Sequence, residues 1–281
     1  MKYTTESAGR PFAALALVLL LASACTAQAD VTQYVRFSHG GVISYGILQG
    51  ETINVLEGDL FDSPTETGEA VPLADVQLLA PCDPSKVIAV GLNYQSHLGD
   101  REPAEYPGLF AKYPTSIVAH EDDIIMTEDA NNLHYEAELV VVIGKRASNV
   151  PVGEAAEYVF GVTAGNDISE RDWQQADLQW FRAKASDTFG PIGPAIVTGL
   201  DYNDLLVQSR VNGEVLQTGR SSDLIFDIET IVSYVSRYVT LLPGDVIFTG
   251  TPGTTMAMQP GDVVEIEVEG VGVLRNTVVR R

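Results

Sequence analysis

Two glutamates, Glu136 and Glu138, lie one residue apart at the start of an apolar run that continues to Ile143. Because side chains alternate along a β strand, both carboxylates would point to the same face. The uninterrupted apolar run that follows is typical of a strand buried on both faces. Buried like charges are costly unless a cation neutralises them. The pattern therefore indicates a metal site, with a solvated strand end carrying two surface glutamates as the alternative.

A third carboxylate follows another apolar stretch, which begins at Phe160 and ends at Asp167. Asp167 would be a third oxygen ligand if this strand lies beside the first. Alternatively, Asp167 caps the helix expected to begin near Ser169, although Ser169 would cap it equally well. The chain has only 4 His and 2 Cys. Three carboxylates with so few nitrogen and sulfur donors favour a hard cation, Mg²⁺ first, with Mn²⁺ or Ca²⁺ as alternatives.

A candidate general base, His97, follows a short apolar strand that breaks at Gly91. Asp100 comes three residues later, which suits a histidine oriented by an acid. The alternative is a surface turn in which neither side chain has a special role. The following residues, 101–116, have no clean period and are expected to form a long loop of the kind that often becomes a lid.

Substrate-binding groups are expected further along the chain. Arg171, Gln174 and Lys184 are the cationic and amide side chains that a carboxylate-bearing substrate would need, although each could simply face water. The Gly/Thr segment 249–253 lacks the Gly-Lys-Ser/Thr ending of a phosphate-binding loop, which excludes a nucleotide site of that type. Its backbone amides and hydroxyls could still bind a carboxylate.

The chain as a whole is expected to be mostly β. Alternating segments and turn residues predict a small β-rich unit over residues 30–80 and a main domain over residues 81–281. The stretch 63–68 is expected to be loop, and Asn212-Gly213 to form a hairpin turn. Besides the helix expected to begin near Ser169, helices are expected at 154–158 and 225–239. The further expected strands are 31–37, 42–48, 53–56, 263–268 and 273–279.

The first 29 residues have the layout of a secretory signal peptide, with an apolar run too short for a comfortable membrane span. Cleavage after Ala29 would leave Asp30 as the new N-terminus of an exported protein, periplasmic or secreted. Lipid attachment at Cys25 is the second choice. After cleavage at Ala29 only Cys82 would remain, so no intramolecular disulfide is expected. A net charge of −21 argues against nucleic acid and anionic membrane surfaces as partners.

Four segments together resemble the fumarylacetoacetate hydrolase family, which includes 2-hydroxyhepta-2,4-diene-1,7-dioate isomerase-like enzymes. The resemblance covers about residues 81–281. It implies a mixed β-roll or distorted barrel, usually dimeric, that acts on a small 2-oxo acid. The segments that carry it are Ala89–Tyr94 with His97, Tyr135–Leu139 with Ile143–Lys145, Asn166–Gln174, and Val211–Glu214 leading to Thr249–Pro252.

The resemblance also implies roles for individual residues. It makes His97 and Asp100 a lid dyad, in which Asp100 stands where the family usually has Glu and Glu102 is a possible substitute. His134 stands where the family often has Asp. The implied Mg²⁺ or Mn²⁺ ligands are Glu136, Glu138 and Asp167, and the implied substrate contacts are Arg171, Gln174, Lys184 and Thr251.

The activity expected first is hydrolysis of a C–C bond in a 2,4-dioxo acid such as an acylpyruvate. His97 would activate water, while Lys184 and Arg171 balance the developing negative charge. Isomerisation or decarboxylation of a related 2-oxo or 2-hydroxydienoic acid uses the same chelate and stays an alternative. An exported metal-dependent binding protein that has lost catalysis is the alternative from another class.

Overall fold

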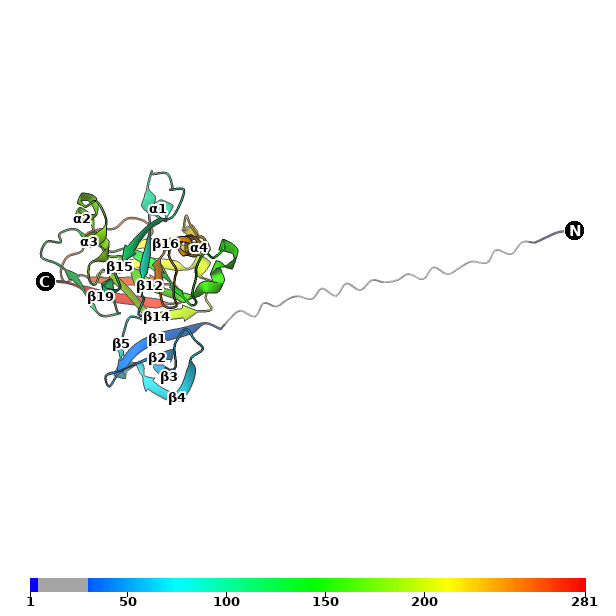
Figure 1. Ribbon diagram of the computed structural model, residues 1–281, viewed down its shortest axis with the longest axis horizontal. Helices are drawn as coiled ribbons and strands as arrows, with labels where there is room; N and C mark the ends of the chain where they lie inside the picture. Colours follow the sequence, from blue (N-terminus) through cyan, green and yellow to red (C-terminus); the bar gives the residue numbers. More distant parts are fainter. Residues whose placement is uncertain (5–29) are drawn as a thin grey trace.

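The computed structural model describes residues 1–4 and 30–281 (Figure 1). The predicted signal peptide, residues 1–29, therefore lies outside the described residues from position 5 onward, as do its cleavage site and Cys25. Within the described parts, no helix is long and apolar enough to cross a bilayer.

A 12-stranded mixed sheet forms the centre of the molecule, and the mostly β prediction is confirmed. The path of the sheet is open rather than closed into a barrel, with β4 and β7 at its two ends. In addition, β5 (Gln77–Leu78) pairs with β1, and β8 (Ile117–Val118) pairs with β14. In order across the sheet, the strands on the path are β4 (Thr65–Pro72), β3 (Thr52–Glu57), β2 (Val42–Gln49), β1 (Thr32–His39), β14 (Gly190–Thr198), β12 (Val159–Asn166), β11 (Ala137–Ile143), β17 (Val246–Phe248), β6 (Val87–Gly91) and β7 (Gly108–Lys112).

The N-terminal strands β1 to β4 form a meander that extends the large sheet (Figure 1). Antiparallel pairing of β1 with β14 joins this meander to the rest of the chain. The predicted strands of this part are confirmed, but the loop expected over 63–68 is wrong from Thr65 onward, where β4 begins. Its exposed threonines and glutamates pair with β3 at the sheet edge, where polar side chains can face water.

Strand β11 carries the predicted apolar run and is buried along its whole length. Leu139 and Val141 pack into one hydrophobic cluster, whereas Val140 and Val142 pack into a second. Because alternate side chains face opposite sides of a strand, apolar residues cover both faces of β11. Antiparallel pairing with β12 and β17 satisfies its backbone on both edges.

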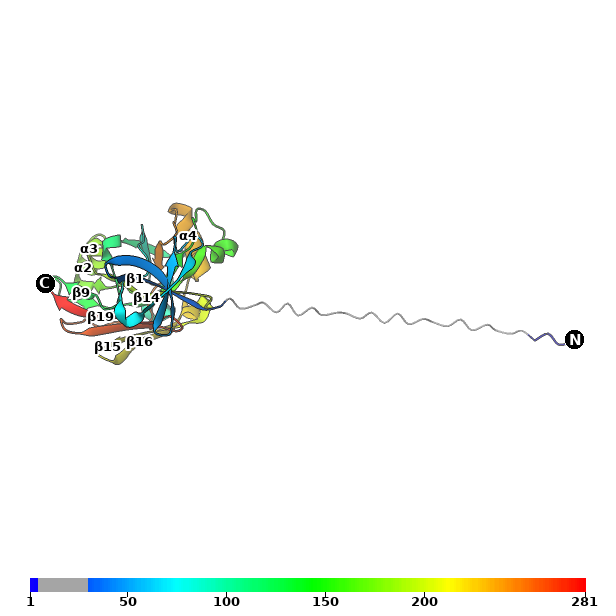
Figure 2. The same ribbon diagram turned by 90° about the horizontal axis from the view of Figure 1, so that it is seen from below.

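A five-stranded sheet packs on the same core and includes the predicted Asn212-Gly213 hairpin. Both turn residues have positive φ, at 51° and 84°, which suits Asn and Gly in a two-residue hairpin turn. In Figure 2, β15, β16 and β19 lie together on one side of the molecule, away from α4. The strands are β16 (Glu214–Arg220), β15 (Leu206–Val211), β18 (Val263–Val268), β19 (Gly272–Arg280) and β9 (Asp123–Met126); β10 (Leu133–His134) and β13 (Ser169–Glu170) form a separate pair.

Helices are short and few among the described residues. The longest is α4 (Ile228–Tyr238), which the Asp227 side chain caps by accepting a hydrogen bond from the Thr230 amide. This confirms the helix predicted near 225–239, and the one predicted near 154–158 is the 3₁₀ segment η3 (Val152–Tyr158). The other helical segments are α1 (Gln95–Leu98), α2 (Arg171–Ala176), α3 (Phe181–Ala185), η1 (Leu73–Asp75), η2 (Pro114–Ser116), η4 (Tyr202–Asp204) and η5 (Ser221–Asp223).

Candidate metal and substrate site

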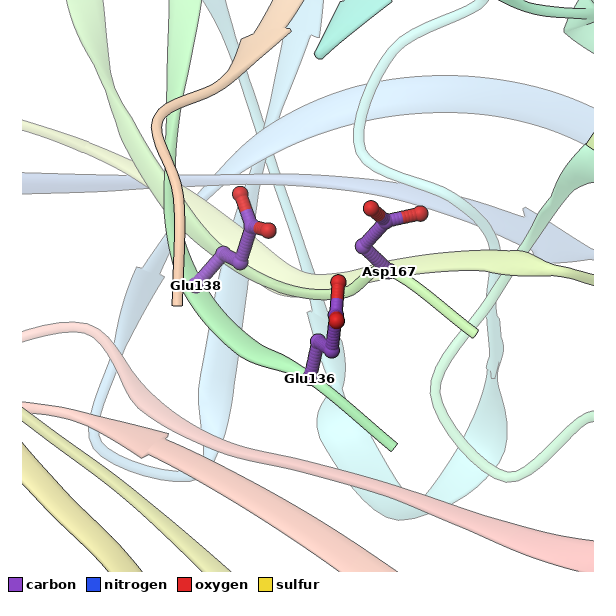
Figure 3. A group of neighbouring side chains, drawn as sticks. All are labelled: Glu136, Glu138 and Asp167. Carbon is purple, nitrogen blue, oxygen red and sulfur yellow. The ribbon is translucent and has the colours of Figure 1, made fainter. Parts of the chain in front are cut away.

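Three buried carboxylates converge at one end of the β11–β12 pair (Figure 3). One oxygen each from Glu136, Glu138 and Asp167 lies within 4.8 Å of the others. The residues are only 4%, 1% and 1% exposed, respectively. Such a cluster of acids is what a bound divalent cation would require.

Strand pairing explains why Asp167, which is distant in the sequence, lies beside the two glutamates of the E-x-E pair. In the antiparallel register, Glu138 lies opposite Gly165, and Ala137 lies opposite Asn166. Beyond the last paired residue, the Asp167 amide donates to the Glu136 carbonyl oxygen over 3.0 Å. The Glu136 amide in turn donates to the Asn166 side-chain oxygen over 2.9 Å. Pairing of β12 with β11 therefore brings the third acid beside the first.

The helix-cap alternative for Asp167 is not what the structure contains. The cap of α2 is Glu170, whose side chain accepts from the Trp173 amide over 2.8 Å. The same carboxylate also accepts from the Asn132 amide. Neither Asp167 nor Ser169 caps this helix, because Glu170 occupies the position directly before Arg171, and the Ser169 hydroxyl donates to the Asp167 carbonyl oxygen instead.

Three cations surround two of the carboxylates. Lys184 Nζ lies 2.6 Å from both Glu136 Oε2 and Asp167 Oδ2. Arg171 donates to Glu136 Oε1 over 2.5 Å. Lys112 Nζ donates to Asp167 Oδ1 over 2.5 Å and also to the Lys184 carbonyl oxygen. Both lysines are nearly inaccessible to water, so their charges act on the acids with little screening.

The paired glutamates titrate in opposite directions. Burial acts to raise the pKa of Glu136, but the adjacent Lys184 and Arg171 charges outweigh it and hold the pKa far below its usual range. Burial, together with the nearby Asp167 and Glu136 charges, raises the pKa of Glu138 well above its usual value. Burial also opposes the charged form of Lys184, yet the same two acids raise its pKa, so this lysine stays cationic.

Glu138 is the feature that best fits a metal ion. Within residues 30–281, its carboxylate has one hydrogen-bond donor, the Gly250 amide at 2.7 Å, and no ion pair with a basic side chain. A buried carboxylate without a cation is costly. The oxygen-only donor set of the three acids matches Mg²⁺ or Mn²⁺ chemistry.

His97 lies on α1 with its ring against the same site. Its Nδ1 lies 2.6 Å from the Gly253 carbonyl oxygen, and its Nε2 lies 3.7 Å from Glu136 Oε1. Because a carbonyl only accepts, the contact assigns the proton to Nδ1 and leaves Nε2 as the basic atom. Asp100 and Glu102 are exposed, and within residues 30–281 no hydrogen bond or ion pair joins either of them to His97. The His97–Asp100 dyad stays a prediction.

Most of the site residues predicted from the sequence line one small cavity of about 30 Å³. Arg171 also donates to the Gln174 side-chain oxygen over 2.8 Å, and this orients both groups. The Thr251 hydroxyl accepts a 2.8 Å hydrogen bond from Gln217, which leaves its own proton available to a ligand. Since this volume holds about one water, a substrate must extend into neighbouring space. The predicted residues in the lining are His97, Glu136, Glu138, Arg171, Gln174, Lys184 and Thr251.

Two functional candidates escaped the sequence analysis. Lys112 lies within the predicted loop 101–116, but residues 108–112 form β7, which pairs with β6 and buries the lysine. The sequence signal for a buried lysine at this position is that Lys112 directly follows the apolar stretch Leu109–Ala111. Gln217 is buried on β16 and positions Thr251, and nothing in its neighbouring residues distinguishes it from a surface glutamine.

His134 is a further polar residue beside the acids. It contacts the Thr255 hydroxyl and the Asn132 side chain, each at 2.8 Å. Burial and the nearby Arg171 charge lower the pKa of His134 to about 4, so its ring is neutral at physiological pH.

Comparison with known proteins identifies similar chains. Residues 86–279 match the family model described as fumarylacetoacetate (FAA) hydrolase C-terminal, and residues 32–81 match a model described as Rv2993c-like, N-terminal. The 2-hydroxyhepta-2,4-diene-1,7-dioate isomerase structure from Mycobacterium marinum is 41% identical, with a TM-score of 0.84 over 89% of this chain and 99% of that chain.

Two further relatives carry different names. The human mitochondrial oxaloacetate tautomerase FAHD2A is 40% identical over 225 residues, which is 74% of this chain and 71% of that protein. The structure of a fumarylacetoacetate hydrolase from Exiguobacterium antarcticum is 35% identical, with a TM-score of 0.75 over 89% of this chain and all of that chain.

Proposed function

Because the chain belongs to the fumarylacetoacetate hydrolase family, we propose that it is a divalent-metal-dependent isomerase of 2-oxo acids. The reaction is a keto–enol conversion or the related double-bond shift in a 2-hydroxydienoic acid. The observation that carries the proposal is the buried Glu136–Glu138–Asp167 cluster with the basic nitrogen of His97 beside it. Relatives named as a tautomerase and as an isomerase support the same reaction class.

The carboxylate cluster would hold the cation, which supplies Lewis-acid stabilisation of negative charge on the substrate's 2-oxygen when bound. His97 Nε2 would move the proton between oxygen and carbon. Lys184 stays charged and lies against the same acids, so it would balance negative charge that develops on the substrate. Arg171 and Thr251 present donors to the substrate carboxylate.

Isomerisation requires fewer catalytic components in this site than hydrolysis does. A proton shift needs the chelate and one base, whereas hydrolysis also needs a water molecule activated by that base. The contact that orients His97 is the Gly253 carbonyl rather than a carboxylate. Hydrolysis of an acylpyruvate, which the sequence alone favours, is the second candidate, supported by the relative named as a fumarylacetoacetate hydrolase.

The test follows both reactions in one experiment. Metal-stripped protein is assayed with and without Mg²⁺, using the enol form of oxaloacetate and a small acylpyruvate, with ultraviolet absorbance for enol loss and coupled detection for released pyruvate. Metal-dependent enol loss without cleavage supports the isomerase. Pyruvate release from the acylpyruvate would support the hydrolase instead. Metal-dependent binding of these compounds without turnover of either one would support the alternative that the chain is a binding protein without catalysis.

The matched controls compare two of the E-x-E pairs of this chain. Glu136→Ala combined with Glu138→Ala should abolish the metal-dependent rate. The same double change at Glu265 and Glu267, on the partly exposed face of β18, should not affect it. Equal loss in both variants would contradict the assigned metal site.

His97→Ala tests the proton-transfer role. We expect kcat to fall about 100-fold or more, the usual contribution of a positioned general base, while the affinity for a metal-chelating inhibitor is retained. The measurement is the steady-state rate together with inhibitor binding by calorimetry. A variant that keeps full kcat would exclude His97 as the base.

A further inference from the structure

Two larger cavities adjoin the small site cavity, and they differ in chemistry. One, of about 390 Å³, is lined by Gly91, Leu109, Phe110, Leu178, Trp180 and other residues without charged side chains. The other, of about 480 Å³, is lined by Arg101, Arg171, His97, His134 and several amide and hydroxyl side chains. The polar cavity shares His97, Arg171 and Gln174 with the site cavity, so a substrate held at the acids can extend into it.

The lining of the polar cavity contains two arginines and no carboxylate. The chain carries 38 acidic residues against 17 lysines and arginines. Because Arg171 is already paired with Glu136, Arg101 supplies the positive charge of this wall that no described carboxylate balances. That charge locally offsets the repulsion that the whole molecule exerts on an anion. This cavity therefore fits a negatively charged group of the substrate.

Arg101 is the arginine of this wall with the fewer partners among the described residues. Its Nε donates to the Leu98 carbonyl oxygen over 3.1 Å, which holds the side chain at the end of α1. Its two terminal nitrogens have no partner within residues 30–281. Arg171, in contrast, already donates to Glu136, Gln174 and Thr255. A guanidinium with both terminal nitrogens available binds a carboxylate well.

We propose that Arg101 forms a subsite for a second substrate carboxylate, so that the protein selects dicarboxylic 2-oxo acids over monocarboxylic ones of the same length. The inference rests on the proposed function, because the first carboxylate and the 2-oxo group must be held at the metal site. It adds a specificity-determining residue that takes no part in the proton transfer.

The experiment compares three probes by calorimetry with the Mg²⁺-loaded protein. Oxalate reaches only the metal site, whereas 2-oxoglutarate and 2-oxopentanoate have the same chain length and differ in the second carboxylate. The wild type should bind 2-oxoglutarate more tightly than 2-oxopentanoate. Arg101→Gln should reduce that preference about tenfold, as expected for one charge-assisted contact, and should leave oxalate affinity unchanged.

Two variants sharpen the comparison. Arg101→Lys should keep part of the preference, because the charge remains and the planar fork is lost. Arg146→Gln removes the same charge from an exposed position outside the cavity and should keep the full preference. Loss of the preference in Arg146→Gln would mean that net charge, not Arg101, creates it.

The outcomes separate the inference from the proposed function. If oxalate binds but the wild type has equal affinity for 2-oxoglutarate and 2-oxopentanoate, the subsite is wrong and the proposed function stands. The same holds if oxalate binds but Arg101→Gln keeps the full wild-type preference for 2-oxoglutarate. If oxalate shows no Mg²⁺-dependent binding, the proposed function fails and the subsite fails with it.

Discussion

At the scale of single residues, the two glutamates of the E-x-E pair do different work although their types and burial match. Glu136 has Lys184 and Arg171 within hydrogen-bond distance, whereas Glu138 has only the Gly250 amide within the described chain. Burial and the nearby Asp167 and Glu136 charges raise the pKa of Glu138, so this carboxylate would gain most from a divalent cation. In the proposed site, metal affinity would thus be gained at the expense of metal-free stability.

Glu138→Gln should therefore stabilise the metal-free protein. The folded-state pKa of Glu138 lies above the ordinary value near 4.3, so its stabilising contribution is present at acid pH and is lost as pH rises through the folded pKa. At pH 7–8 the substitution should increase the free energy of unfolding by about 1 kcal/mol or more, or about 2–4 °C in Tm.

Thermal unfolding with EDTA and with Mg²⁺ measures this effect. The wild type should gain Tm on addition of Mg²⁺, and Glu138→Gln should gain little, because it lacks one ligand. Glu57→Gln is the control and should behave like the wild type, because Glu57 is exposed and its side chain has no ion pair or hydrogen bond within residues 30–281. A metal-free Tm below that of the wild type for Glu138→Gln would contradict the account.

At the scale of elements, close contact between strands sets the geometry of the acids. Gly165 on β12 faces Glu138 across the pair, and a Cβ there would lie 2.3 Å from Val140 Cγ2 and 2.7 Å from Phe248 Cε1. These contacts come from β11 and β17, so the glycine lets three strands approach at the point from which the ligands project. A side chain at this position would push β12, and with it Asp167, away from β11.

Gly165→Ala should lower the free energy of unfolding by about 1–3 kcal/mol, the usual cost of overpacking a core. Its matched control is Gly153→Ala, since a Cβ at Gly153 has nothing within 4 Å. Chemical denaturation of both variants tests the difference, and Mg²⁺ affinity should fall only in Gly165→Ala. Equal stability of the two variants would show that the strands can separate without penalty.

At the scale of the whole molecule, the N-terminal meander and the site-bearing strands belong to one sheet, joined through β1 and β14. The site lies on the far side of β14 from β1, at the β11–β12 pair. Export of the protein and assembly into a homodimer stay predictions. The strongly acidic character, with a net charge of −21, is unsuited to binding nucleic acid.

We propose export with cleavage after Ala29, which should give a mature chain beginning at Asp30. Expression of the full chain with its own N-terminus, followed by cell fractionation and intact-mass analysis, checks this expectation. Cys25→Ala should leave the processing unchanged. A mature chain that begins at a lipid-modified Cys25, or an uncleaved chain retained inside the cell, would show that the prediction is wrong.

Local patterns in the sequence were sufficient for several parts of the structure. Alternation predicted that Glu136 and Glu138 point the same way, and in the structure Glu138 lies on the buried strand β11, Glu136 lies directly before it, and their carboxylates meet. The Asn212-Gly213 pair marked a hairpin, and apolar spacing identified α4. These features depend on neighbours within a few residues, so their signals are present in short windows. The same acids predict a hard cation, because oxygen ligands select hard ions, and its identity stays a prediction.

Only the tertiary structure decided which distant groups meet. The pairing of β11 with β12 brought Asp167 to the glutamates, and the pairing of β6 with β7 turned a predicted loop into a strand that buries Lys112 against Asp167. Gln217 reaches Thr251 from a separate sheet. Such contacts depend on burial and backbone pairing between segments far apart in the chain, and no short window of sequence encodes that choice of partner.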